Sequence, residues 1–102
     1  MIAILRSPAA ERDLEDIWIT IAADSPPAAT RTLQAIAAKI ERLAGHPRMG
    51  PRRPDIRPAA RMLVEGPYLV LYETRPDTDD GQVDAVEIVR VVDGRRDLAT
   101  LF

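Results

Sequence analysis

The positions of the prolines constrain this chain more than any other feature of its sequence. Pro8 and Pro26 each follow a serine, and this pairing is typical of a helix start. The serine side chain can accept a hydrogen bond from the first turn, and a proline at the first helical position gives up no donor that the helix needs. Four more prolines fall within residues 46–58 and exclude a regular helix or strand there. The prolines therefore predict two helices followed by an irregular connector.

Apolar residues recur at helical spacing after each of the two predicted starts. The first set is Leu14, Ile17, Trp18 and Ile21, and the second is Leu33, Ile36, Ile40 and Leu43. Spacings of three and four residues place such side chains on one face of a helix. We therefore expect two amphipathic helices that form an antiparallel hairpin, with Trp18 packed in the core and Gly45 ending the second helix.

Four segments have the apolar, β-branched or aromatic content that is typical of strands. They are Ile2–Arg6, Arg61–Glu65, Tyr68–Thr74 and Val83–Val92. The last of them is apolar on both faces, which predicts a central strand. The predicted fold class is α+β, in a single domain of residues 1–102. It comprises an N-terminal strand, an antiparallel helical hairpin, a three-stranded antiparallel meander in one sheet and a short C-terminal helix.

The composition excludes several kinds of active site. With no cysteine and a single histidine, the chain cannot form a disulfide, a thiolate nucleophile or a site with several histidine ligands. His46 is expected on an exposed loop, and both serines occupy cap positions, so we expect no catalytic residue, metal or cofactor. No apolar run approaches the roughly 20 residues of a membrane helix. No signal peptide is recognisable, and a soluble cytoplasmic protein is therefore expected.

Charge is distributed in blocks along a chain whose formal net charge is -2. Residues 9–24 and 77–87 are acidic, whereas residues 42–61 contain six arginines and one aspartate. Such blocks are typical of solvated faces and loops. The negative total argues against a dedicated nucleic-acid-binding protein, which usually carries a clear positive excess.

Four stretches form a recognisable series: AERDLEDIW at residues 10–18, LAGHPRMG at 43–50, YLVLY at 68–72 and VRVVDGRRDL at 89–98. Their order and spacing resemble the ParE/RelE superfamily of bacterial type II toxins, nearest the ParE branch. The resemblance implies a toxin that arrests growth and that a cognate antitoxin neutralises in a hetero-oligomeric complex. It also implies that the antitoxin combines a DNA-binding part, of the ribbon-helix-helix type, with a C-terminal segment that wraps the toxin.

The two branches of this superfamily differ in activity, since RelE-like members cleave mRNA on the ribosome and ParE-like members inhibit DNA gyrase. RelE-like nucleases place a tyrosine near the C-terminus or a histidine after the last strand. This chain has Phe102, which lacks a hydroxyl, and Asp93 at those places. We therefore expect a gyrase inhibitor that acts by protein–protein binding and is not an enzyme. The alternatives are a RelE-type ribosome-dependent mRNA endoribonuclease and a non-toxic antitoxin-binding regulatory partner.

Two binding surfaces are expected. Arginine within or beside a sheet is rarely buried unless it pairs or faces a functional surface. The target-binding surface is expected to comprise Arg61, Arg90, Arg95, Arg96, Leu101 and Phe102. The competing interpretation is structural pairing of these arginines, with Glu65, Glu73 and Glu87 as candidate partners. The antitoxin tail is expected in an apolar groove between the hairpin and the sheet edge, with contacts to Leu14, Trp18, Arg48, Arg52, Arg53 and Arg57.

Overall fold

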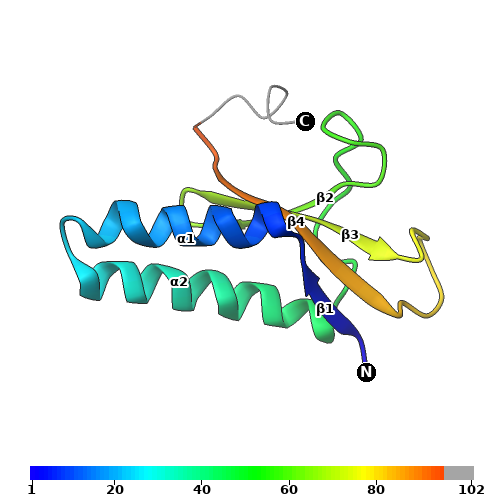
Figure 1. Cartoon of the computed structure of the whole chain (residues 1–102). Helices are drawn as coiled ribbons and strands as arrows, with labels where there is room; N and C mark the ends of the chain where they lie inside the picture. Colours follow the sequence, from blue (N-terminus) through cyan, green and yellow to red (C-terminus); the bar gives the residue numbers. More distant parts are fainter. Residues whose placement is uncertain (96–102) are drawn as a thin grey trace.

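The computed structural model describes residues 1–95, so Arg96, Leu101, Phe102 and the expected C-terminal helix lie outside the described residues. The elements are β1 (Ala3–Arg6), α1 (Pro8–Ala22), α2 (Pro26–Glu41), the 3₁₀ helix η1 (Arg42–Ala44), β2 (Arg61–Glu65), β3 (Tyr68–Arg75) and β4 (Ala85–Asp93). The two helices lie side by side next to one sheet (Figure 1). The predicted α+β class is confirmed, with the N-terminal strand, the hairpin and the meander in the predicted order.

One mixed sheet contains the four strands in the order β1-β4-β3-β2. The last three strands form the predicted antiparallel meander, and β1 pairs in parallel with β4. Because β4 has a strand on each side, its predicted central place is confirmed. It begins at Ala85 rather than at Val83, which is buried in the preceding loop instead. The predicted turn after β2 contains Gly66, whose φ of 58° is accessible to glycine because it has no Cβ.

Both predicted helix starts are confirmed. The Ser7 hydroxyl accepts a hydrogen bond from the amide of Ala10 at 3.0 Å, and proline opens α1. Ser25 accepts from the amide of Ala28 at 3.3 Å in the same way at the start of α2. Each cap satisfies a donor that the first helical turn cannot satisfy internally.

The hairpin covers one face of the sheet, and the core lies between these two layers. The helices contribute Ala10, Leu14, Ile36 and Ile40, and η1 contributes Leu43. The strands contribute Leu63, Val70, Tyr72, Val86, Ile88 and Val91. Burial of a large apolar side chain stabilises a fold by about 1.5–3 kcal/mol. This contact between the layers is therefore the main apolar support of the fold.

Trp18 does not join that core. Its side chain is 43% exposed, so the prediction that it packs against the sheet is wrong. Successive residues of an α-helix are about 100° apart around the axis. The inward face of α1 runs through Leu14 and Ile17, which leaves Trp18 at the margin of that face. The helical spacing of apolar residues therefore assigned Trp18 to the core, although the core does not include it.

The N-terminal end of α1 covers an edge of β4 that β1 leaves open. β1 pairs only with Ala85 to Ile88 of β4. At that point the amide of Ser7 donates to the carbonyl of Ile88 at 2.9 Å, and the Ser7 hydroxyl donates to the carbonyl of Val89 at 2.8 Å. Val89 is also the extra residue of a β-bulge, because Tyr72 stands opposite Ile88 while Leu71 stands opposite Arg90.

Asp13 continues this edge contact nearly two helical turns further along α1. Its carboxylate accepts from the Val91 amide at 3.0 Å and from Nε and Nη2 of Arg90 at 2.7 and 2.9 Å. The hydrogen bond with Asp13 raises the pKa of Arg90, which stays charged. Structural pairing of Arg90 was one of the two expected roles. The acid is Asp13, however, and not Glu87, which pairs with Arg75.

The connector (residues 45–60) has no regular element, as predicted, and is fixed to the sheet through Gly50. The Gly50 amide donates to the Tyr72 hydroxyl at 2.9 Å, and the carbonyl of Gly50 accepts from Nη1 of Arg61 at 3.0 Å. Burial raises the pKa of the Tyr72 phenol, which remains protonated at neutral pH. The Tyr72 ring and its hydroxyl are both inside the fold.

No helix within residues 1–95 combines the length and the apolar character that crossing a membrane requires.

Replacing Asp13 by asparagine should lower the free energy of unfolding by about 2 kcal/mol. The reason is that the largely buried guanidinium of Arg90 loses its charged partner. Chemical unfolding in urea measures the change. Asp16→Asn, three residues along the same helix and exposed, is the matched control and should change stability by less than about 0.5 kcal/mol. Equal losses in the two variants would contradict the structural role of Asp13.

Replacing Gly50 by alanine should destabilise the fold by about 3 kcal/mol or more. A Cβ there would lie 2.7 Å from the carbonyl oxygen of Met62 and 2.9 Å from the Tyr72 hydroxyl, and the backbone cannot yield without opening the connector. Gly45→Ala is the control because a Cβ at Gly45 meets no atom within 4 Å. A melting curve of each variant tests the difference, and similar melting temperatures would refute it.

Candidate partner-binding groove

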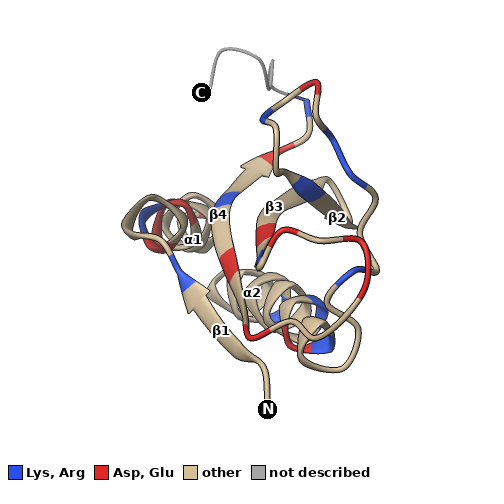
Figure 2. Cartoon of the chain, turned by 90° about the vertical axis from the view of Figure 1, so that its right-hand side faces the viewer, with Lys and Arg blue, Asp and Glu red and all other residues tan. Residues whose placement is uncertain are grey.

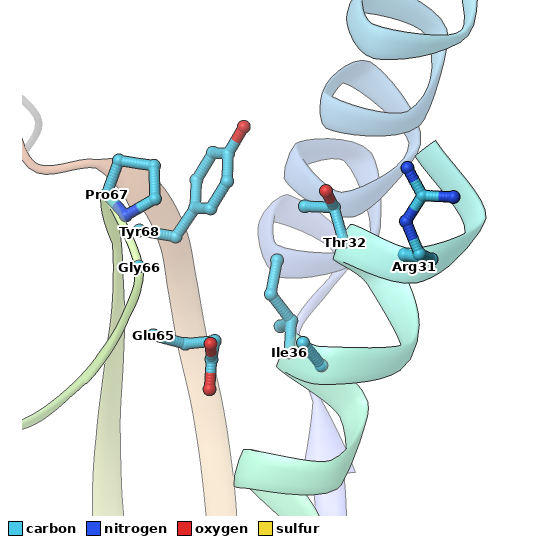
Figure 3. A pocket seen from close by; sticks show the side chains of 8 residues that line it. Arg31, Thr32, Ile36, Glu65, Gly66, Pro67 and Tyr68 are labelled. Carbon is cyan, nitrogen blue, oxygen red and sulfur yellow. The ribbon is translucent and has the colours of Figure 1, made fainter. Parts of the chain in front are cut away.

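A hollow of about 350 Å³ lies between α2 and the turn that joins β2 to β3. Its lining comprises Arg31, Thr32, Ala35 and Ile36 of α2 and Glu65, Gly66, Pro67 and Tyr68 of the hairpin turn. Figure 3 shows the Tyr68 ring and the Ile36 side chain projecting toward each other from the two sides. The floor is therefore apolar, while a threonine and charged groups lie along the rim.

A second hollow of about 200 Å³ lies between α1 and the end of β4. It is lined by Asp13, Asp16, Ile17 and Thr20 of α1, by Val91, Val92 and Asp93 of β4, and again by Tyr68. Tyr68 borders both hollows, so they adjoin at this side chain, between the helical hairpin and the end of the sheet. We treat the two hollows together as one binding surface and call it the Tyr68 groove. The closed end of the hairpin extends beyond the strands at this side of the molecule (Figure 1).

The two ends of the Tyr68 groove differ in charge. Asp16 lines the α1 end, whereas Arg31 lines the α2 end. Glu65, also at the α2 end, lies 4.0 Å from the ammonium of Lys39. An open groove with an apolar floor and opposite charges at its ends suits an amphipathic segment of another protein.

Helix α1 also carries exposed apolar side chains outside this groove. Trp18 is 43% exposed and Ile19 is 57% exposed, whereas Ile17, which lines the groove, is half-buried. A helix on the surface of an isolated domain normally carries polar residues on its outer face. Neighbouring exposed aromatic and branched side chains are typical of a surface that another protein covers.

The connector arginines expected at the antitoxin interface face the chain's own β3–β4 loop (residues 76–84). Arg48 donates to the carbonyls of Thr78, Asp80 and Gly81 at 2.8–3.0 Å. Arg52 donates to Asp77 at 2.9 Å and to Asp79 at 2.8 Å. Figure 2 shows the red acidic positions of this loop close to blue positions of the connector.

The other two connector arginines also have partners within the chain. Arg53 pairs with Asp55 at 2.7 Å, and Arg57 lies 3.5 Å from Glu73. Leu14 is buried in the core, so its side chain is not offered to a partner. Of the six residues expected to contact the antitoxin, Trp18 is the one that presents an apolar side chain at the surface. Antitoxin binding by the four arginines stays a prediction.

The arginines expected at the target surface do not come together. Arg61 stands opposite Tyr72, and Arg90 stands opposite Leu71, so their side chains leave the sheet on opposite faces. Arg61 is only 6% exposed, contrary to its expected place on an exposed cluster. Arg95 is the exposed member among the described residues and pairs with Asp93 at the end of β4.

The Tyr68 groove contains residues that sequence reasoning missed. Thr20, Thr32 and Arg31 have no spacing or motif that distinguishes them from other exposed helical residues. Their role as lining follows from the position of the β2–β3 turn against both helices, which local sequence does not encode. Tyr68 had been identified as a strand residue without a site role. One sequence signal could have located it: Tyr68 directly follows the Gly66-Pro67 turn, so it begins a strand at the end of the sheet.

Within the part of the chain that the structure describes, no group of three histidine or acidic side chains is arranged to hold a metal ion. His46 is exposed at the start of the connector, as predicted.

A family model described as "ParE toxin of type II toxin-antitoxin system, parDE" matches residues 4–98. Toxin ParE1 of Mycobacterium tuberculosis is 35% identical over 95 residues, which are 92% of this chain and 91% of that protein. Toxin ParE3 of Caulobacter vibrioides is 38% identical over 71 residues, 70% of this chain and 64% of that protein. A solved structure titled "Chromosomal ParDE TA system from P. aeruginosa" superposes with a TM-score of 0.71 at 20% identity, covering 91% of this chain and 96% of the other. At that identity the superposition establishes the fold.

Proposed function

The chain belongs to the ParE toxin family of type II toxin–antitoxin systems, and on this premise we propose that it arrests growth by binding DNA gyrase and that a cognate antitoxin neutralises it. The proposed action is protein–protein binding in the cytoplasm rather than catalysis. The observation that carries the antitoxin half of the proposal is the Tyr68 groove, together with the exposed Trp18 and Ile19 of α1. These features supply an apolar surface that a free helical hairpin would otherwise leave in water.

The charges of the groove specify the antitoxin segment further. A helix lying along the groove would place an apolar residue over Tyr68. It would carry a basic residue near Asp16 and an acidic residue near Arg31, since opposite charges across an interface favour one orientation. The antitoxin is proposed to add a DNA-binding part of the ribbon-helix-helix type outside this contact.

The proposed target surface centres on Arg95 and the segment that follows it. The Arg95 side chain is 82% exposed, and its ion pair with Asp93 lies at the surface. Exposed pairs contribute about 0–1 kcal/mol, so Arg95 can exchange Asp93 for an acid of the target at small cost. Arg61 and Arg90 bond within the fold, to the Gly50 carbonyl and to Asp13, so we leave them out of this surface.

The groove and the proposed target surface adjoin at Asp93. This residue lines the groove next to Val92 and also pairs with Arg95. An antitoxin segment in the groove would therefore lie beside the guanidinium that we propose contacts gyrase. Neutralisation would follow from steric exclusion of the target, without any change in the toxin fold.

The purified chain should inhibit DNA supercoiling by gyrase, and Arg95→Ala should raise the concentration needed for half-inhibition about tenfold. Arg42→Ala, which removes an exposed arginine after α2, is the matched control and should inhibit like the unchanged chain. Cleavage of mRNA in a translation reaction, with supercoiling unaffected, would replace the gyrase proposal by the endoribonuclease alternative. Absence of both effects and of growth arrest on expression would favour a non-toxic regulatory partner.

Thr20→Arg should weaken antitoxin binding about tenfold or more, because it places a cation on the wall of the groove beside Asp16, where we propose that the antitoxin carries a basic residue. Thr30→Arg is the control, since Thr30 is exposed on α2 and lines neither hollow. Calorimetric titration with the product of the neighbouring antitoxin gene measures both affinities. Equal affinities for the two variants would place the antitoxin outside the Tyr68 groove.

A further inference from the structure

Three arginines converge on the β3–β4 loop from the connector and β2. Arg48 binds main-chain carbonyls of the loop, whereas Arg52 binds its carboxylates. Arg61 begins β2 and directs Nη2 toward the same carboxylate of Asp79, at 3.6 Å. The loop is therefore held in two ways, through its backbone by one arginine and through its acids by the other two.

The guanidinium of Arg61 is not fully satisfied by these contacts. It is 6% exposed, and its Nη1 donates to the Gly50 carbonyl at 3.0 Å. The distance of 3.6 Å from Nη2 to Asp79 is too long for a hydrogen bond. Its Nε is buried without any partner in the structure. A buried guanidinium with an unsatisfied Nε and no hydrogen bond from Nη2 to Asp79 favours an anion that approaches more closely than Asp79 does.

The Asp79 side chain, which lies next to Arg61, is easily displaced. The Asp79 side chain is 83% exposed, so it approaches Arg61 from the solvent side rather than from the core. The Asp77 side chain is 41% exposed. Ion pairs of this kind contribute about 0–1 kcal/mol each, and ordinary salt weakens them. The two arginines therefore hold the loop acids only weakly.

We propose that Arg52 and Arg61 form a carboxylate site for an acidic, extended segment of a partner protein, and that Asp77 and Asp79 occupy this site in the free chain. The loop itself indicates the chemistry of the ligand, because it fills the site with two acids separated by one residue. A partner segment with the pattern acid-any-acid would present its carboxylates at the same spacing. This site is separate from the Tyr68 groove, and the inference holds whether or not gyrase is the target.

The loop would then act as an internal competitor. An acid of the partner can bind only when Asp79 has left the site. The apparent affinity is therefore the intrinsic affinity multiplied by the fraction of time that the site is free. Neutralising Asp77 and Asp79 should free the site while Arg48 keeps the loop in place through its backbone. Arg48 makes this possible because its bonds to the carbonyls of Thr78, Asp80 and Gly81 do not depend on the loop's carboxylates.

The test uses a fluorescent peptide with the sequence of residues 76–84 as the acidic segment, and fluorescence anisotropy at low salt as the readout. The full chain is compared as wild type, as Asp77→Asn/Asp79→Asn and as Asp80→Asn/Asp84→Asn. The last variant removes the same charge from the same loop but leaves both acids that contact Arg52 in place. Melting curves establish that each variant is folded, and Asp79→Asn alone replaces the first double variant if that variant does not fold.

We expect the peptide to bind Asp77→Asn/Asp79→Asn about fivefold to tenfold more tightly than either other chain. Adding Arg52→Gln, or using a peptide with asparagine in place of its first two aspartates, should abolish this gain. Equal binding to the two neutralised variants would attribute the effect to net charge and overturn the proposal, as would no binding to any chain. Displacement of the peptide by inorganic phosphate, but not by chloride at equal ionic strength, would identify a phosphate site and overturn the carboxylate assignment.

Discussion

The Asp13 carboxylate joins the helical hairpin to the sheet at the edge of β4 that β1 leaves open. It accepts from the Val91 amide and from Nε and Nη2 of Arg90, so one acid pairs with the strand backbone and a partly buried cation together. Ser7 makes the corresponding contact nearly two turns earlier while it caps α1. The direction in which α1 leaves the sheet follows from these two residues, and so does the position of α2 packed against it.

That direction creates the groove. Because α1 is tied to β4 near its N-terminal end, its far half and the start of α2 extend past the sheet, with Tyr68 at the inner end of the space. The same geometry leaves Trp18 and Ile19 outside the core. The apolar surface that we assign to the antitoxin is therefore a by-product of how the fold is anchored. A partner that covers it removes from water an apolar area that the described residues 1–95 leave exposed.

Charge patterning shows how local interpretation and tertiary structure diverge. The basic block of the connector and the acidic block after β3 each looked like a solvated surface. In the folded chain they meet, with Arg52 on Asp77 and Asp79 and Arg48 on the loop carbonyls. The two segments are far apart in sequence, and the antiparallel meander brings them to the same end of the sheet. That topology decides which opposite charges meet, because the interaction between two charges depends on their distance in space and not on their separation along the chain.

The sequence by itself determined the helix starts at Ser7 and Ser25, the irregular connector, the meander and the membership of the toxin family. Each of these depends on local backbone chemistry or on motifs of neighbouring residues, such as caps, proline and the alternation of strands. Only the tertiary structure decided that Arg90 pairs with Asp13, that Arg61 is buried beneath Gly50, and that Tyr68 stands in a groove. Those outcomes depend on which surfaces meet when layers pack. The free energy of such contacts is set by distance and burial, and neither quantity exists until the chain has folded.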